Sequence, residues 1–217
     1  MAIRLKRWAF AIAIFTATIF LLSGTWRDPW LWACAGVWAA TTLYAMVGVE
    51  DDLLRERFRP PTAGADRVAL TFVRIFALAL VLLGALDSGR WHLAPVSPAF
   101  RGAGLALMAI GFTIFFRAMH ENRFFSAVVR VQDERGHRVV DTGPYSLVRH
   151  PGYAGMLIGM PCVGLALGSW ISAAVGVVLS LMILRRVRFE DSFLRKHLDG
   201  YPEYAARVPH RLVPGLW

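Results

Sequence analysis

The stretch DTGPYSLVRHPGYAG, residues 141–155, combines side chains and backbone-bending residues that can bind a polar ligand. Gly143 precedes a proline, a pair typical of turns, and a glycine lets the backbone approach a ligand closely. Pro151 biases His150 away from helical geometry and suits the first turn of a following helix. The N–H groups of that turn can meet a carboxylate. The alternative is an interfacial loop in which Arg149 reaches the lipid headgroups.

A second candidate site is RRVRFEDSFL, residues 185–194. Arg186 and Glu190 are four residues apart, so on a helix they share one face, while Arg188 and Asp191 point elsewhere. The alternative is a helix end with surface ion pairs. Two acids beside an apolar segment are costly unless they are paired, so the sequence predicts partners for them.

The carboxyl-terminal stretch GYPEYAARVPHRLVPGLW, residues 200–217, is the third candidate. Its mixture of tyrosine, arginine and a terminal tryptophan is typical of a segment on a membrane surface. The functional alternative is a lid that folds back over the polar residues of the first two stretches.

Long apolar runs must position these three stretches. Four runs predict membrane-spanning helices: Trp8–Leu22, Trp30–Val49, Val68–Leu86 and Phe100–Met119. The fifth run, Tyr153–Leu184, is divided by GSW at 168–170. Each half has about fifteen residues and would be about 23 Å long, slightly less than the hydrocarbon thickness, so we expect a tight hairpin that enters the membrane and returns.

Two polar segments lie between these runs. Residues 50–67 predict a charged loop in which Pro60 and Pro61 stop any helix. The longest polar segment is His120–Pro151. The basic start and apolar middle of residues 1–23 resemble a signal peptide, but the apolar character of the whole chain favours an uncleaved first span.

Composition indicates an all-α, polytopic integral membrane protein. Of the 217 residues, 56% are hydrophobic, whereas about 45–50% is usual for soluble domains. We expect a single domain, 1–217, with four spans in 1–119 and the polar loop, the hairpin and the tail in 120–217.

The net charge is +9, and the basic residues that produce it are distributed unevenly among the loops. Arginines lie at the ends of apolar runs and do not interleave with exposed aromatic residues, which argues against nucleic-acid binding and for the lipid bilayer as a partner. The amino terminus, 50–67, 120–151 and the tail from Arg185 are predicted to be cytoplasmic. Three arginines fall on the opposite side: Arg27, Arg90 and Arg101.

Taken together, VQDERGHRVVDTGPYSLVRHPGYAG, RRVRFEDSFL and DGYPEYAARVPHRLVPG resemble the isoprenylcysteine carboxyl methyltransferase family, whose relatives include phospholipid and small-thiol methyltransferases. The resemblance covers about half of the chain, from Arg117 to the end. It departs from the family at Asp191, where a second Glu is usual. The resemblance implies an enzyme that uses S-adenosyl-L-methionine at the cytoplasmic face of a membrane.

The resemblance also implies roles for individual residues. It assigns the cofactor to Gln132, His137, Arg138, Val139, Val140, Gly143, Tyr145, His150, Pro151, Gly152, Tyr153 and Glu190. Arg186 and Arg149 are the expected catalytic groups, and Arg186 and Tyr204 are expected to contact the methyl acceptor. No metal site is expected, because the histidines lack metal-ligand spacing.

The acceptor is expected to be a lipophilic small molecule or lipid. A carboxylate needs no general base, whereas a thiol or an amine would have to be deprotonated, which favours a carboxylate. Small thiols and phospholipid amines remain open. So do an NADPH-dependent reductase of the sterol-reductase type, which has a similar RHP block, and a membrane protein without activity. Abundant alanine and arginine suggest a bacterial source and therefore an inner-membrane location.

Overall fold

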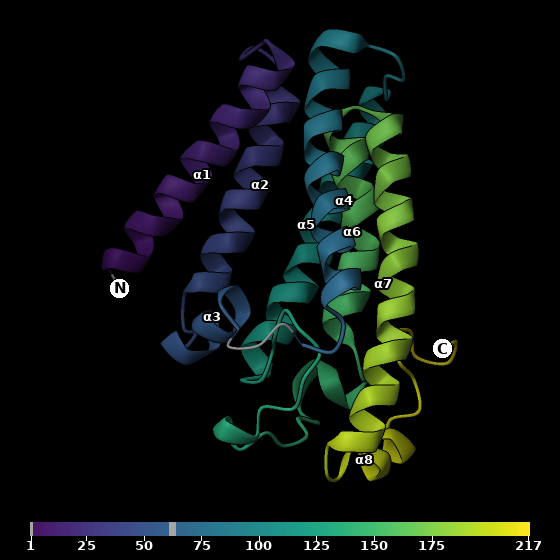
Figure 1. Ribbon diagram of the computed structural model, residues 1–217. Coiled ribbons are helices and arrows are strands. Elements are labelled where there is room, and N and C mark those ends of the chain that lie inside the picture. Colours follow the sequence, from purple (N-terminus) through teal and green to yellow (C-terminus); the bar gives the residue numbers. More distant parts are fainter. Residues whose placement is uncertain (1, 61–63) are drawn as a thin grey trace.

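The computed structural model describes residues 2–60 and 64–217, and the described residues form helices and no β-strand (Figure 1). The α-helices are α1 (Ala2–Ser23), α2 (Pro29–Met46), α3 (Asp51–Phe58), α4 (Arg67–Leu86), α5 (Pro98–Glu121), α6 (Pro151–Leu167), α7 (Trp170–His197) and α8 (Tyr201–Arg207). A π-helical turn, Asp87–Trp91, extends α4, and short 3-10 turns lie at Asp133–Arg135 and Gly143–Ser146. The expected all-α class is confirmed.

Local sequence explains where the long helices begin and end. The Asp28 carboxylate accepts a hydrogen bond from the Trp30 N–H at 2.9 Å and caps α2, whose first residue is a proline. Between α6 and α7, Gly168 adopts φ 98°, and the Ser169 hydroxyl accepts from the Ser172 N–H at 3.1 Å. The GSW break therefore ends one helix and caps the next.

Within the described residues, four helices are long and apolar enough to cross a membrane: Ile3–Ser23, Arg67–Trp91, Pro98–Glu121 and Trp170–His197. Figure 1 shows α6 beside α4, α5 and α7, whereas α1 and α2 are tilted relative to them. The predicted hairpin is present as α6 and α7, but the expectation that both halves are short is wrong. The α7 helix has 28 residues, about 42 Å at helical rise, because it continues past Leu184 to His197.

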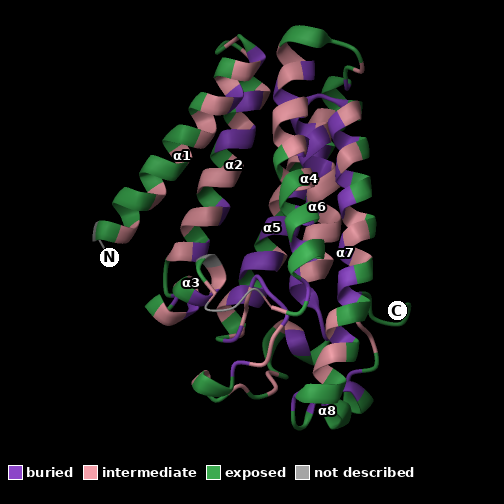
Figure 2. Ribbon diagram, in the orientation of Figure 1, coloured by how far each residue is buried: buried purple, intermediate pink, exposed green. Residues whose placement is uncertain are grey.

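The outward surface of the long helices is apolar. Large exposed apolar side chains lie along α1, α4, α5 and α7, among them Phe10, Phe72, Ile75, Leu107 and Leu181. Figure 2 shows the buried residues gathered on α5, α6 and α7, whereas α1 is mostly exposed or half-buried. A surface of this kind matches lipid rather than water, as a membrane-embedded bundle requires.

The centre of the bundle is the contact between α5 and α6. A Cβ atom added at Gly111 would lie 2.6 Å from the Gly155 carbonyl oxygen and from the Gly159 nitrogen. The two backbones therefore approach so closely that only glycine fits, an arrangement typical of membrane helix pairs. Phe112 and Leu167 belong to the buried apolar cluster beside this contact.

All the segments predicted to be cytoplasmic lie at one end of the bundle. The amino terminus, α3, the 122–150 loop and α8 gather there (Figure 1). The expectation of a loop throughout 50–67 is wrong, because Asp51–Phe58 forms α3. The helix dipole of α3 stabilises the acids in its first turn, Asp51 and Asp52, and the bases in its last turn, Arg55 and Arg57. Pro60 does follow the helix end, while Pro61 lies outside the described residues.

Two arginines at the opposite end have structural partners. Arg90 donates to the carbonyls of Leu21 and Leu22 at the end of α1. Arg101 pairs with Asp28 at 2.8 Å and donates to the Leu167 carbonyl at the end of α6. Cations at these carboxyl-terminal helix ends satisfy free carbonyls, which explains why these residues depart from the charge bias.

Candidate active site

A cavity of about 340 Å³ lies within the end of the bundle where α3, the 122–150 loop and α8 gather. It is lined by residues of all these segments and of α4, α5, α6 and α7. One part of its wall is apolar, with Leu70, Val73 and Ala77 of α4 and Phe115 of α5, and another part carries the polar residues of the loop. The cavity can therefore accommodate a polar and an apolar ligand group together.

Glu190 lies on the cavity wall and is joined to the start of α6. The Tyr153 hydroxyl donates to the Glu190 carboxylate at 2.6 Å, and the His150 Nδ1 atom is 4.0 Å from the other carboxylate oxygen. The first helical hydrogen bond of α6 runs from the Ala154 N–H to His150, so the N–H groups of Gly152 and Tyr153 precede it. The Glu190 carboxylate is thus joined through Tyr153 to the first turn of α6, whose early N–H groups have no helical partner.

The neighbouring acid, Asp191, is turned away from the cavity and is only 1% exposed. Arg149 holds both of its carboxylate oxygens, at 2.7 and 3.1 Å. Arg211 of the tail donates at 3.0 Å, the Tyr201 hydroxyl at 3.0 Å, and the His150 Nε2 atom lies at 3.3 Å. Asp191 therefore joins α7, the loop and the tail. The sequence predicted that both acids need partners, and this prediction is confirmed.

Arg186 shares the cavity wall with Glu190, as the i, i+4 spacing predicted. Its ion-pair partner is Asp66, which lies directly before α4, at 2.7 Å, and Arg186 also donates to the Ala127 carbonyl at 2.5 Å. The guanidinium has five N–H donors, which exceeds the number that these two contacts use. Arg186 is thus fixed in place and retains donors for a ligand.

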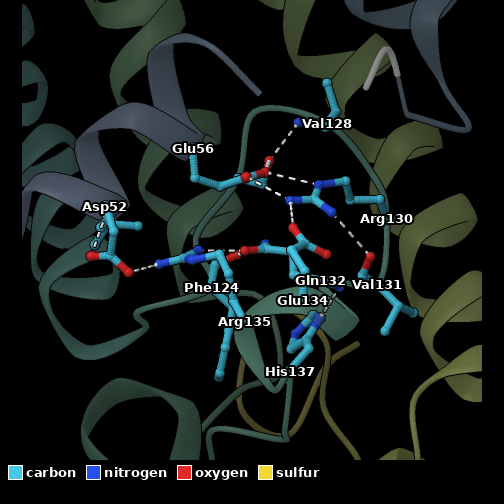
Figure 3. A network of polar contacts seen from close by, with 12 residues as sticks. Asp52, Glu56, Phe124, Val128, Arg130, Val131, Gln132, Glu134, Arg135 and His137 are labelled. Atoms are coloured by element: carbon cyan, nitrogen blue, oxygen red, sulfur yellow. Dashed lines mark hydrogen bonds and ion pairs between the residues drawn. The ribbon is translucent and has the colours of Figure 1, made fainter. Parts of the chain in front are cut away.

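A polar network holds the loop against α3 (Figure 3). Arg130 pairs with Glu56 at 2.7 Å, and Glu56 also accepts from the Ser126 hydroxyl at 2.6 Å. Arg135 pairs with Asp52 at 2.6 Å and donates to the Gln132 side-chain oxygen. The wall of the cavity formed by the loop is therefore positioned by α3.

His137 is a neutral part of this wall. Its Nδ1 atom accepts from the Gln132 N–H at 3.2 Å, and its ring packs on Phe124 with centroids 4.5 Å apart. Burial, with a further contribution from the Arg130 cation, lowers the pKa of His137 to about 4. The Gln132 amide donates to the Phe124 carbonyl at 2.7 Å. Both residues line the cavity, and both have structural contacts within the loop.

The tail packs against the loop. The N–H groups of Arg149 and His150 donate to the carbonyls of His210 and Arg211 at 3.0 and 2.9 Å. The Tyr204 hydroxyl donates to the Tyr145 carbonyl at 2.7 Å, and both side chains are buried. Burial raises the pKa of each phenol, so both remain protonated. This packing of the tail on the loop matches the lid alternative.

The structure brings most of the predicted site residues together. The cavity is lined by Gln132, His137, Arg138, Val139, Val140, Tyr145, Arg149, His150, Gly152, Tyr153, Arg186, Glu190 and Tyr204. Two predicted residues do not line it. Gly143 packs against Glu121 with φ 53°, and Pro151 begins α6.

Sequence reasoning missed Asp66 and Arg57. Asp66 stands directly before an apolar run, where an unpaired acid is costly, and this position could have drawn attention to it. Arg57 lies on α3, a helix that was not expected, and its approach to the cavity depends on tertiary packing.

Comparisons with known proteins match the part of the chain that holds most of the predicted site residues. Residues 100–200 match the family model described as phospholipid methyltransferase. A probable protein-S-isoprenylcysteine O-methyltransferase of Oryza sativa subsp. indica is 35% identical over 108 residues, which cover 48% of this chain and 56% of that protein. The cobalt-zinc-cadmium resistance protein CzcN of Cupriavidus metallidurans is 31% identical over 150 residues, which cover 67% of this chain and 61% of that protein. The chain thus spans less than two thirds of each relative.

A solved structure shares the fold. The eukaryotic intramembrane Ras methyltransferase ICMT superimposes with a TM-score of 0.57 over 96% of this chain and 75% of that chain, at 16% identity. Residues 100–200, which match the family model, hold the α5–α6 contact, the loop and all of α7, and these form much of the cavity wall. Through its carboxyl-terminal half, the chain is therefore similar to the phospholipid methyltransferases and the protein-S-isoprenylcysteine O-methyltransferases, and it shares its fold with ICMT.

Proposed function

We propose that the chain transfers a methyl group from S-adenosyl-L-methionine to the carboxylate of a lipophilic acceptor. The observation that carries this proposal is the meeting of Glu190, Tyr153 and the start of α6 on the wall of a cavity whose other side is apolar. We place this end of the bundle in the cytoplasm, at the inner membrane of a bacterium, in agreement with the distribution of arginines.

The residues present fit the donor. Glu190 can accept hydrogen bonds from its hydroxyl or amino groups, and the N–H groups of Gly152 and Tyr153 can bind its carboxylate. The cavity volume of about 340 Å³ falls within the range of about 300–1,000 Å³ that is usual for ligand sites. When bound, S-adenosyl-L-methionine would supply a methyl group from its sulfonium, and the sulfur would leave as the neutral thioether of S-adenosylhomocysteine.

The contribution of the protein is then to hold and orient the reactants. Alignment of two reactants at near-contact distance contributes up to about 7–11 kcal/mol. Arg186 is fixed by Asp66 and can bind an acceptor carboxylate with its remaining donors. The acceptor oxygen gains the methyl group, an ester forms, and no proton has to move.

A thiol or amine acceptor fits less well. It would need a base, and the two histidines on the cavity wall have other contacts. The His137 Nδ1 atom already accepts a hydrogen bond from the loop, and the His150 Nε2 atom lies 3.3 Å from Asp191. This arrangement favours a carboxylate, as in the reaction for which the isoprenylcysteine O-methyltransferases are named.

Donor binding is the first test. Titration calorimetry on the purified chain in detergent should show binding of S-adenosylhomocysteine and none of NADPH. The Glu190→Gln variant should lose at least tenfold in affinity, because it loses the charge that faces the donor, while its thermal unfolding midpoint stays the same. Glu203→Gln, a change at an exposed position of α8, is the matched control.

Two outcomes would overturn the proposal. Unchanged affinity in Glu190→Gln would remove Glu190 from the donor site, and binding of NADPH instead would indicate a reductase. The acceptor is then identified by incubating membranes with radiolabelled S-adenosyl-L-methionine and analysing the labelled product by mass spectrometry. A base-labile methyl ester is expected.

A further inference from the structure

The cavity wall has a marked excess of positive charge. Among the described residues that line it are six arginines and one acid, Glu190. Three of these arginines have carboxylate partners: Arg130 with Glu56, Arg149 with Asp191, and Arg186 with Asp66. Arg74 and Arg138 are exposed, so water or lipid headgroups screen them. The sixth, Arg57, is the interior cation whose charge has no carboxylate in contact among the described residues.

Arg57 is held in place by two aromatic rings and a backbone carbonyl, and the acid on its wall, Glu190, forms no ion pair with it. Its guanidinium carbon lies 5.2 Å from the ring centres of both Phe115 and Phe125, and its Nη1 atom donates to the Ser126 carbonyl at 2.9 Å. Burial and the nearby Arg186 cation lower the pKa of Arg57 to about 10, although Tyr153 and Glu190 act in the opposite direction, so Arg57 remains charged at neutral pH. A fixed, half-buried cation at a cavity wall is suited to binding an anion.

A purely structural role for Arg57 is a weaker explanation, because α3 has other attachments to the loop. Glu56 binds Ser126 at 2.6 Å and Arg130 at 2.7 Å, and Asp52 binds Arg135 at 2.6 Å. These contacts hold α3 without the guanidinium. Partial burial of a cation without a carboxylate in contact is costly, and an anionic ligand at Arg57 would relieve this cost.

We propose that Arg57 binds the anionic group of the methyl acceptor and thereby selects acidic amphiphiles over neutral ones. This inference rests on the proposed function and adds a specificity-determining residue from α3, which lies outside the matched residues 100–200. Arg57 and Arg186 both line the cavity, and the apolar side chains of Leu70 and Val73 line it too. An amphiphile can place its acidic group between the two guanidinium groups and its chain along α4.

Electrostatics supports an acidic acceptor. The donor brings a positive sulfonium to a cavity that already holds Arg57. A neutral or cationic acceptor would leave this positive charge unbalanced, whereas an anion would compensate it in a site where charges are poorly screened. Arg57 would thus discriminate by charge between acceptors of the same shape, binding the anionic one more tightly.

The test uses two probes, N-acetyl-S-farnesyl-L-cysteine and its uncharged carboxamide, each titrated into the purified chain saturated with S-adenosylhomocysteine. The wild type should bind the acid at least tenfold more tightly than the amide. In Arg57→Gln the two affinities should agree within twofold, while the affinity for S-adenosylhomocysteine stays the same. Arg55→Gln, which changes the same charge at an exposed position of α3, should keep the wild-type preference.

The other outcomes have defined meanings. An acid preference that persists in Arg57→Gln, or one that the wild type lacks, overturns the inference. A parallel loss of S-adenosylhomocysteine affinity would place Arg57 in the donor site and also overturns it. Failure of the wild type to bind S-adenosylhomocysteine contradicts the proposed function itself. Arg57→Lys keeps the charge without the planar fork, so it should retain a reduced preference, and it provides the comparison if Arg57→Gln does not fold.

Discussion

At the scale of single residues, two adjacent acids have opposite environments. The Glu190 side chain is 25% exposed and faces the cavity, whereas the Asp191 side chain is 1% exposed and is surrounded by cations. Successive positions on a helix point about 100° apart, so one acid can face a ligand while its neighbour faces the tail. Asp191 therefore contributes to stability, whereas we propose that Glu190 contributes to binding.

Asp191→Asn should destabilise the chain strongly. The change leaves Arg149 buried without its counter-ion and weakens the contact of Arg211, a loss that usually costs about 3–5 kcal/mol. Thermal unfolding in detergent should show a large decrease in the midpoint. Asp199→Asn, at an exposed position, is the control and should have little effect. Equal midpoints for the two variants would contradict the role of Asp191.

Residues that carry a local pattern could be predicted from the sequence, and those that depend on packing could not. The shared face of Arg186 and Glu190 follows from helical spacing, and Tyr153 follows from its place after Pro151. Arg57 is brought to the cavity by contacts with residues about 60 positions later, Phe115 and Phe125. The spacing of residues along the chain does not predict such long-range contacts.

At the scale of elements, the α5–α6 contact positions the cavity. The backbones of α5 and α6 touch at Gly111 and Gly155. This contact fixes the loop that follows α5 relative to the start of α6. Small residues at this contact give the close packing that holds membrane helices together.

Gly111→Ala should therefore destabilise the bundle. The added Cβ atom would lie 2.6 Å from backbone atoms of α6, and overpacking of this kind costs about 1–3 kcal/mol. The unfolding midpoint in detergent should fall, and affinity for S-adenosylhomocysteine should fall with it. Gly36→Ala on α2 is the matched control, since its Cβ atom would meet nothing within 4 Å. A midpoint for Gly111→Ala equal to that of the control would contradict tight α5–α6 packing.

Hydropathy predicted the helices of the bundle well, because a run of apolar residues directly reflects contact with lipid. It failed where a helix leaves the apolar region. The last three turns of α7 are charged, so the apolar run ends at Leu184 although the helix ends at His197. The short helix α3 is hidden among charges for the same reason, since its support is the ion pairs of Asp52 and Glu56.

At the scale of the whole molecule, the two ends of the helix bundle differ in charge. The end that holds the cavity also holds the amino terminus, α3, the 122–150 loop and α8 (Figure 1). At the opposite end, Arg90 and Arg101 bind helix-end carbonyls and so have a structural role. With these two accounted for, the charge bias of the loops supports our proposal that the cavity end faces the cytoplasm.

Labelling of single cysteines should reveal this orientation. Ser146→Cys lies in the exposed loop at the cavity end, and Ser97→Cys lies in the exposed connector at the other end. The native cysteines, Cys34 and Cys162, are buried and should react little. In spheroplasts, a membrane-impermeant maleimide should label Ser97→Cys at once, and it should label Ser146→Cys only after permeabilisation. The reverse pattern would place the cavity outside the cell, away from the cytoplasmic methyl donor, and would contradict both the orientation and the proposed route of the donor from water.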